Sequence, residues 1–573
     1  MQDAEPVVGW GHATSEESKD TQTVSTVFGS CLKALGIEEV FTLVGGGIAP
    51  LMDALQKCQL KIRHFRHEGG AAFAAHEASV ASGLPVAVCV TTGPGIYNAL
   101  TGLAAARADG GRVILLSGAT SPSMRGKGAV QETGPDTMLS EIFTPGSIFH
   151  FAKIISDSSE LPFVFSKLRV GLQKTGGFIA HISLPLSLQS SPATPISIPH
   201  TKVYESRPSR QALQEVITAL QGKRFGIWVG YGALQASNEL KALVERTGCS
   251  VIATPRAKGI FSEFDAHYVG VSGAGAHPSV AEYMKDFSPE VLLVLGSRLG
   301  EVSSFWSPVM IPRNGFIHVD SDANAFGSGY PGVNTMGICS DVRLFIEDLL
   351  AALPKEYVKQ PHYKSTFTST PLSPRPDGLV RTPFLLQEVQ RRIVEGSNAT
   401  VMAESGNSFA WANHALRFSI PGRYRTSALF GSMGHFVTGV VGAAMVQQNK
   451  AVVLAGDGAM LMNNEINTAV AYQAQAVWIV LNDARFGLTE HGMKALNLTP
   501  VETKIPITDF VAFAKSQGAE GLCVENEIDL AAGLEAAMAS KQPFVLDVRI
   551  DPNDCAPLLA TRIASLMKQR GNL

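Results

Sequence analysis

The stretch that decides the fold reads A-V-V-L-A-G-D-G at 451–458, M-N-N-E at 462–465 and W-I-V-L-N-D-A-R-F-G at 478–487. Two apolar strands, joined by an amphipathic segment, predict a βαβ unit with parallel, neighbouring strands. The glycine turn lies at the first helix N-terminus, where free N–H groups and the helix dipole attract phosphate. Because the strand ends lie side by side, Asp457 and Asp483 can reach one hard cation, and oxygen ligands suit Mg²⁺. Taken alone, a G-D-G tripeptide is more often a plain turn.

Composition describes a large protein with ample core and excludes several classes. The length of 573 residues predicts three or four domains, and apolar residues make up 45% of the chain. A net charge of −3 indicates no basic field for nucleic acid, and no run approaches the about 18 apolar residues of a membrane span. Residues 1–20 are acidic without an apolar run, so we expect a flexible N-terminus and no targeting peptide. Seven scattered cysteines without a C-x-x-C pair favour reduced thiols and a cytoplasmic location.

Three α/β blocks follow one another, separated by polar, proline-marked stretches at about 186–210 and 355–382. We predict domains at 21–190, 205–354 and 383–573. Near-continuous apolar strands alternate with helical patterns, which is typical of doubly wound parallel sheets covered on both faces. The predicted strands lie at 40–44, 62–66, 85–92 and 112–117 in the first block and at 225–229, 250–253, 291–295 and 316–319 in the second.

Three further motifs accompany the G-D-G unit: R-H-E at 66–68, T-T-G-P-G-I-Y-N at 91–98 and G-S-M-G-H at 431–435. Together, the four motifs resemble the thiamine-diphosphate-dependent enzymes of the acetohydroxyacid synthase and pyruvate decarboxylase superfamily. The resemblance runs from about residue 20 to the C-terminus. It implies pyrimidine-binding, central and diphosphate-binding domains with ligands beyond the carboxyl ends of the strands. It also implies a homodimer or homotetramer whose active sites lie between subunits.

The resemblance assigns the cofactor's pyrimidine side to three residues. Glu68, in H-E-x-x-A-A, matches the carboxylate that bonds N1′ of thiamine diphosphate, although a helix N-terminal glutamate interacting with the dipole is the alternative. The carbonyl of Gly431 would accept from the 4′-amino group. Met433 would support the bent cofactor, unless it is ordinary core filler. His435 is either a substrate-facing residue or a histidine outside the site.

The resemblance also implies the diphosphate and metal ligands. Asn407 and Ser408 in E-S-G-N-S-F and the N–H groups of Gly458 and Ala459 would bind the diphosphate, with Gly93 and Gly456 at strand ends. Asp457, Asp483 and the backbone carbonyl of Arg485 would bind Mg²⁺.

Two departures from the family pattern concern this metal site. The family commonly has asparagine at the place of Asp483, and the gap from G-D-G to Glu465 is one residue shorter here. Catabolic acetolactate synthases also carry the aspartate, so the site is expected to be functional. The Arg485 side chain could compensate for the added charge.

Carbon–carbon bond formation is favoured over simple decarboxylation. The loop V-G-G-G-I-A-P at 44–50 has no carboxylate, and no His-His pair occurs, whereas pyruvate decarboxylases carry both features. Gln131 in A-V-Q-E-T matches a substrate-positioning glutamine of synthases; an ordinary surface-loop residue is the alternative. Gly492 stands where anabolic synthases have tryptophan, which predicts a bulkier acceptor.

We therefore expect a carboligase that decarboxylates a 2-oxo acid, with pyruvate favoured, and transfers the acyl unit to a second carbonyl compound. The alternatives are a non-ligating decarboxylase of the benzoylformate or phenylpyruvate type and a non-catalytic cofactor-binding member. In synthase relatives the central domain binds FAD. G-Y-G-A-L at 230–234 and L-G-S-R-L-G-E at 295–301 fall at strand ends where it could lie, but neither is a G-x-G-x-x-G, so FAD stays open.

Overall fold

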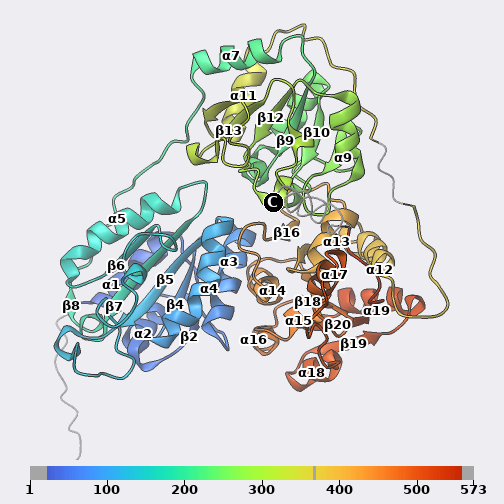
Figure 1. Cartoon of the computed structure of the whole chain (residues 1–573). Coiled ribbons are helices and arrows are strands. Elements are labelled where there is room, and N and C mark those ends of the chain that lie inside the picture. The colour runs from blue at the N-terminus through green and yellow to red at the C-terminus, as the bar shows by residue number, and fades with distance from the viewer. Residues whose placement is uncertain (1–21, 366–369, 558–573) are drawn as a thin grey trace, which may run out of the picture.

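A computed structural model describes residues 22–365 and 370–557, and the predicted flexible N-terminus at 1–20 lies outside them. The chain forms three six-stranded sheets with helices on their faces (Figure 1). Every ladder within these three sheets is parallel. The predicted fold class, an α/β chain with three doubly wound parallel sheets, is confirmed.

The first sheet has the order β3-β2-β4-β5-β7-β6. Its strands are β2 (Glu39–Leu43), β3 (Lys61–His64), β4 (Val86–Val90), β5 (Arg112–Ala119), β6 (Phe151–Ile154) and β7 (Phe178–Pro185). Its helices are α1 (Val24–Ala34), α2 (Ala49–Lys57), α3 (Glu68–Ser82), α4 (Pro94–Asp109), α5 (Leu161–Leu172) and α6 (Leu186–Gln189). A separate antiparallel pair joins β1 (Gln22–Thr23) to β8 (Pro192–Ala193), so the segment expected as a linker begins with ordered structure.

The second sheet has the order β11-β10-β9-β12-β13-β14. Its strands are β9 (Phe225–Val229), β10 (Ser250–Ala253), β11 (Tyr268–Val271), β12 (Val291–Leu295), β13 (Phe316–Asp320) and β14 (Thr335–Cys339). Its helices are α7 (Arg210–Leu220), α8 (Ser237–Thr247), α9 (Pro278–Glu282), α10 (Glu301–Ser304) and α11 (Val342–Ala352).

The third sheet has the order β16-β15-β17-β18-β20-β19, which is the topology of the first sheet. Its strands are β15 (Thr400–Ala403), β16 (Tyr424–Thr426), β17 (Ala451–Gly456), β18 (Ala476–Asn482), β19 (Glu520–Val524) and β20 (Phe544–Arg549). Its helices are α12 (Thr382–Val389), α13 (Asn407–Ala415), α14 (His435–Val446), α15 (Asp457–Met460), α16 (Ile466–Ala471), α17 (Gly487–Ala495), α18 (Phe510–Ser516) and α19 (Glu527–Ala539).

Each sheet has a switch point, a pair of neighbouring strands from which the chain continues toward opposite edges of the sheet. These points lie between β2 and β4, between β9 and β12, and between β15 and β17. In open parallel sheets, ligands bind in the crevice beyond the strand ends at such a point. The topology therefore offers one crevice in each block.

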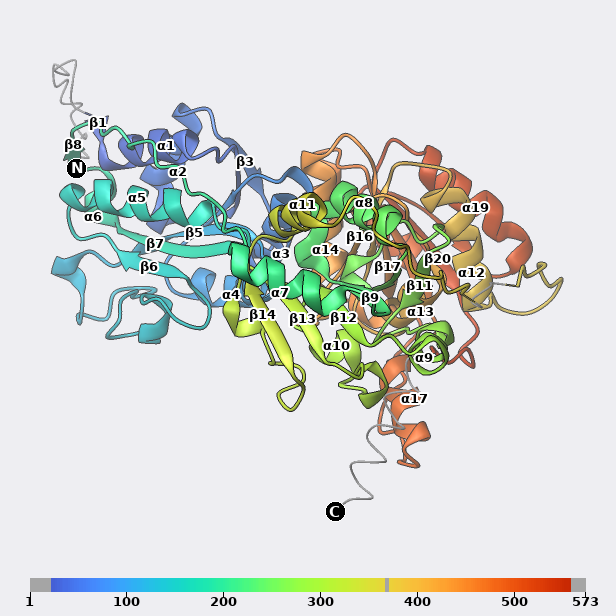
Figure 2. The same ribbon diagram turned by 90° about the horizontal axis from the view of Figure 1, so that it is seen from above.

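Helices α3 and α14 join the first block to the third and lie beside each other in both views (Figures 1 and 2). Their contact is close because glycines of α14 face α3: a Cβ on Gly442 would lie 2.0 Å from the carbonyl oxygen of Ala74. One on Gly439 would lie 2.6 Å from Cγ of Glu77. A single apolar core accordingly extends from Phe41 in β2 of the first sheet to Trp478 in β18 of the third sheet.

Within residues 22–365 and 370–557, no helix combines the length and the apolar character that a membrane crossing needs.

Candidate functional site

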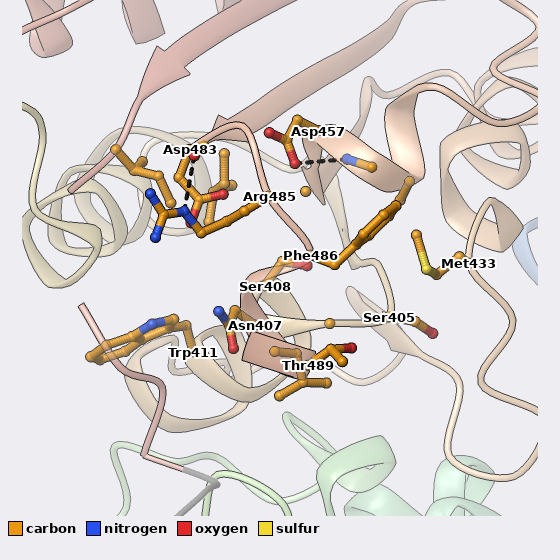
Figure 3. Close-up of a pocket in the computed structure, with 18 of the residues that line it drawn as sticks. Ser405, Asn407, Ser408, Trp411, Met433, Asp457, Asp483, Arg485, Phe486 and Thr489 are labelled. Atoms are coloured by element: carbon orange, nitrogen blue, oxygen red, sulfur yellow. Dashed lines mark hydrogen bonds and ion pairs between the residues drawn. The ribbon is translucent and has the colours of Figure 1, made fainter. Parts of the chain in front are cut away.

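The main pocket lies at the switch point of the third sheet, beyond the ends of β15 and β17 (Figure 3). It brings together the predicted residues Asn407, Ser408, Gly431, Met433, Gly456, Asp457, Gly458, Ala459, Asp483 and Arg485. Trp411 and Phe486 also line it, and the sequence reasoning missed both. Trp411 follows Asn407 by four residues and so lies on the same helix face, which was the available signal.

Helix N-termini converge on this pocket. Helix α13 begins at Asn407, α15 at Asp457 and α17 at Gly487, and all three residues line the cavity. The first N–H groups of a helix have no partner within the helix, and the dipole is positive at that end, so this arrangement attracts an anionic group such as a diphosphate. The pocket therefore fits a phosphorylated ligand.

Two carboxylates meet at the same pocket. Strands β17 and β18 pair in register from Ala451 with Ala476 to Gly456 with Leu481, which places Asp457 and Asp483 at neighbouring strand ends. Burial, and next the charge of Asp457, raises the pKa of Asp483 to about 7. One oxygen of Asp457 accepts from the N–H of Gly458 at 2.7 Å, and the other is buried with no hydrogen-bond partner within residues 22–365 and 370–557. Two converging acids with a free oxygen are a donor set that suits a hard divalent cation.

The turn after Asp483 is held by charge and by close packing. The Arg485 guanidinium lies 3.7 Å from a carboxylate oxygen of Asp483 and 3.3 Å from one of Glu490. The side chain expected to offset the extra negative charge is therefore beside it. Gly487 allows the turn to approach the pocket wall, since a Cβ there would lie 2.8 Å from Nδ2 of Asn407. The Phe486 ring extends between Asp457 and Met433 (Figure 3).

Glu404 connects two loops of the pocket, and the sequence reasoning did not single it out. Its carboxylate is fully buried and accepts from the backbone N–H groups of Phe436 and Val437 at 2.8 and 3.0 Å. Its other oxygen accepts from the N–H of Ser405 at 2.8 Å. Glu404 thereby ties the 405–408 turn to the first turn of α14, directly after the loop of Gly431 and Met433. A glutamate at the end of an apolar strand was the available signal.

Glu68, Gly93 and Gln131 lie together in the first block. Glu68 is buried and its carboxylate accepts from Nδ2 of Asn98 at 3.0 Å. The hydroxyl of Thr92 donates to Oε1 of Gln131 at 3.1 Å. Gln131 also packs against Gly93, since a Cβ on Gly93 would lie 3.1 Å from Cβ of Gln131.

The first-block group does not belong to the main pocket of the same chain. Among the described residues, those that line the main pocket all come from the range 382–554, so the structure does not bring the first-block group to it.

Two other expectations concern residues near the motifs. Gly492 lies on α17 but is not among the residues that line the main pocket, whereas Leu488 and Thr489 are. His435 is fully buried, and its Nε2 lies 3.0 Å from a carboxylate oxygen of Glu77, so it faces α3 and not this pocket.

A second cleft lies at the switch point of the central sheet. It is lined by Tyr231 and Gly232 after β9 and by Gly296 to Arg298 after β12, so the two glycine loops noted for FAD come together. These backbones are in contact: a Cβ on Gly230 would lie 2.3 Å from the carbonyl oxygen of Gly296. Arg107, Arg256 and Arg298 and the acid Asp320 also line the cleft.

One group of buried histidine and acid side chains has the spacing of a metal site. The ligand atoms of His76, Glu77 and His435 lie within 4.8 Å of one another. However, Nε and Nη2 of Arg425 donate to the two oxygens of Glu77 at 2.9 and 3.1 Å. The guanidinium charge already occupies the place of a cation, so this group is an ion-pair network.

Comparison with known families identifies the chain. The profile of the thiamine pyrophosphate enzyme N-terminal TPP binding domain matches residues 22–139. The profile of the central domain matches residues 213–349, and that of the C-terminal TPP binding domain matches residues 404–548. Together these profiles span more than half of the chain, and each lies on one of the three sheets.

Individual relatives agree over nearly the whole length. A putative acetolactate synthase large subunit of Mycobacterium tuberculosis is 28% identical over 91% of this chain and 96% of its own. Acetolactate synthase 2 of Nicotiana tabacum, a chloroplastic protein, is 27% identical over 91% of this chain and 81% of its own. A putative thiamine pyrophosphate-containing protein of Bacillus subtilis is 24% identical over 92% of each. With all three family domains matched in order on three parallel sheets, the chain belongs to the thiamine-diphosphate-dependent enzymes of the acetolactate synthase-like superfamily.

Proposed function

We propose that this enzyme is a carboligase that decarboxylates a 2-oxo acid, with pyruvate as donor, and joins the acyl unit to a second carbonyl compound. The observation that carries the proposal is the composition of the first-block loops. The 44–50 loop packs on the loop that follows β4: a Cβ on Gly45 would lie 2.6 Å from the side chain of Thr91. Gln131 accepts a hydrogen bond from the hydroxyl of Thr92 in the loop that follows β4. The 44–50 loop offers no acid to protonate a product, which favours attack on a second carbonyl.

The reaction balances without an oxidant. The bond between C1 and C2 of the 2-oxo acid breaks and CO₂ leaves. A new bond forms between that C2 and the carbonyl carbon of the acceptor, whose oxygen takes up one proton. Thiamine diphosphate, when bound, supplies a nucleophilic ring carbon and an electron sink for the loss of CO₂.

Residues of this chain would bind the cofactor and move its protons. Asn407, Ser408 and the N–H groups of Gly458 and Ala459 would hold the diphosphate at the helix N-termini, with Gly456 leaving space at the strand end. Asp457, Asp483 and the carbonyl of Arg485 would hold Mg²⁺. The carbonyl of Gly431 would accept from the 4′-amino group, and Met433 would support the ring system. Glu68 would exchange a proton with N1′ of the pyrimidine.

We also propose a homodimer, or a homotetramer built from two such dimers, with each active site made by two subunits. The separation of the two residue groups supports this, since Glu68, Gly93 and Gln131 do not line the main pocket of their own chain. Apolar side chains are exposed around both groups. Val130 is 92% and Leu139 61% exposed in the first block, and Met462 is 50% exposed beside the main pocket. A second copy would cover such surfaces.

Product analysis tests the reaction. The protein loaded with thiamine diphosphate and Mg²⁺ is incubated with pyruvate and a panel of aldehydes and ketones, and products are identified by mass spectrometry. We expect hydroxyketones that contain the acetyl unit and the acceptor. Free aldehyde formed in equal amount to CO₂, without any ligated product, would instead support the benzoylformate- or phenylpyruvate-type decarboxylase.

The metal assignment predicts different effects for two substitutions of one residue. Asp483→Ala should weaken Mg²⁺ binding by about tenfold or more, because a ligand oxygen is lost. Asp483→Asn should retain activity, since its amide oxygen can still coordinate. Calorimetric titration with Mg²⁺ in the presence of cofactor measures the metal affinity of both variants, and a turnover assay measures their activity. An equal loss in the two variants would mean that the charge, and not the oxygen, is required.

Complementation tests the shared active site. Glu68→Gln and Asp457→Ala chains are expressed separately and together. Each alone should be inactive, whereas mixed dimers contain one site with both defects and one with neither. Statistical mixing should therefore restore about a quarter of wild-type activity. Mixed dimers verified by mass spectrometry but inactive would place both residues in the same active site of one chain.

For the second cleft we propose a bound dinucleotide such as FAD. The switch-point position, three arginines for phosphate groups and Asp320 for ribose hydroxyls support it. Protein purified without added flavin should release FAD on denaturation, measured by absorption and fluorescence. Protein that contains no flavin and takes up none from solution would contradict this assignment.

A further inference from the structure

The M-N-N-E motif contributes a residue whose contacts the proposed reaction does not yet explain. Glu465 is 5% exposed and lies directly before α16, in the third block. Its φ of +54° is a left-handed conformation that non-glycine residues rarely adopt. Such a backbone persists only where surrounding contacts hold it, so the orientation of this side chain is constrained.

The carboxylate of Glu465 binds backbone of the first block, about 400 positions away in sequence. It accepts from the N–H of Arg66 at 2.9 Å through Oε2 and from the N–H of His67 at 3.1 Å through Oε1. The hydroxyl of Thr468 donates to Oε2 as well. These two backbone N–H groups come directly before Glu68, the first residue of α3.

The first turn of α3 is shaped to admit this carboxylate. A Cβ on Gly70 would lie 2.3 Å from Oε1 of Glu465, so glycine leaves the space that the carboxylate fills. The charge also lies at the N-terminus of a 15-residue helix, where the dipole favours an anion. Ordinarily a residue of the helix's own chain segment caps this end; here a carboxylate of another block is added to the cap formed by His67.

Neighbouring contacts join the same two segments but involve other groups. The hydroxyl of Tyr472 accepts from the N–H of His64 at 2.6 Å. Nε of Arg66 donates to Oδ1 of Asn467 at 2.7 Å, at the exposed edge of the contact. The strand-to-helix turn that carries Glu68 therefore rests on the segment 465–472.

We propose that Glu465 is a positioning residue that sets the place of the Glu68 carboxylate by holding the backbone of Arg66 and His67. The inference rests on the proposed proton exchange at Glu68. Asn98 fixes one oxygen of Glu68 from α4, and Glu465 fixes the turn from which that side chain extends. Loss of the Glu465 contact should shift Glu68, and small displacements of a proton-transfer group slow the transfer strongly.

Two substitutions on opposite sides of the contact test the proposal. Glu465→Gln replaces one acceptor oxygen by an NH₂ group, which leaves a backbone N–H facing a donor. Gly70→Ala places a methyl group where the carboxylate lies. Asn467→Ala is the matched control, because it removes the adjacent side-chain contact between the same segments and leaves Glu465 in place. Glu68→Gln is measured alongside.

The first readout needs no cofactor. Backbone hydrogen–deuterium exchange of Arg66 and His67, resolved by NMR or by mass spectrometry of peptides, should be about tenfold faster in Glu465→Gln and Gly70→Ala and unchanged in Asn467→Ala. The second readout is hydrogen–deuterium exchange at C2 of bound thiamine diphosphate, expressed per molecule of bound cofactor. We expect it to slow by about ten- to a hundredfold in the two test variants, with cofactor affinity unchanged.

The outcomes separate this inference from the proposed function. If Glu68→Gln leaves C2 exchange normal, the role of Glu68 itself is wrong. If Glu68→Gln slows C2 exchange while both test variants exchange at the wild-type rate, Glu465 does not position Glu68. A lower melting temperature with normal C2 exchange in the folded, loaded protein would reduce Glu465 to a stabilising contact and would also overturn the proposal.

Discussion

All three blocks meet at one buried ion pair between Glu77 and Arg425. Burial alone would raise the pKa of Glu77, but the Arg425 guanidinium and the neighbouring histidines hold it well below its usual range. Removing one partner of such a pair leaves an uncompensated buried charge, so both must be present. Glu77 lies on α3, Arg425 on β16, and Nη1 of Arg425 also donates to the hydroxyl of Tyr231 in the central block at 2.9 Å. His435, at the start of α14, bonds the same carboxylate, so the pair fixes the helix that follows the Gly431 and Met433 loop.

Around this pair, function depends on how closely backbones approach one another. Glycines of α14 bring the third block onto α3, and glycines at the strand ends build the pocket and the cleft. A Cβ on Gly458 would lie 2.6 Å from the Phe486 ring, so the turn after Asp457 and the turn after Asp483 meet only because that position has no side chain. In the second and third sheets, a crevice at the switch point is lined by glycines of the loops that follow the strands.

Local rules predicted much of this architecture. The strand expected at 40–44 is β2 (Glu39–Leu43), and that expected at 291–295 is β12 (Val291–Leu295). Strand β7 (Phe178–Pro185) was not predicted, because His181 and Ser183 interrupt its apolar run. In the folded protein the hydroxyl of Ser117 lies 2.8 Å from Nε2 of His181 and donates to Ser183 at 2.9 Å, so these polar groups are satisfied inside the sheet. A single sequence does not reveal such partners on a neighbouring strand.

The sequence by itself determined that Asp457 and Asp483 meet at the main pocket. Asp457 and Asp483 belong to one βαβ unit, and parallel pairing of adjacent strands follows from local patterns of apolar residues and turns. Only the tertiary structure decided which blocks touch. It placed Glu68 away from the main pocket of its own chain, turned His435 toward Glu77, and brought Glu465 to the backbone of Arg66 and His67. These contacts join segments more than 350 residues apart, so they depend on packing between whole blocks and leave no periodic signal in either segment.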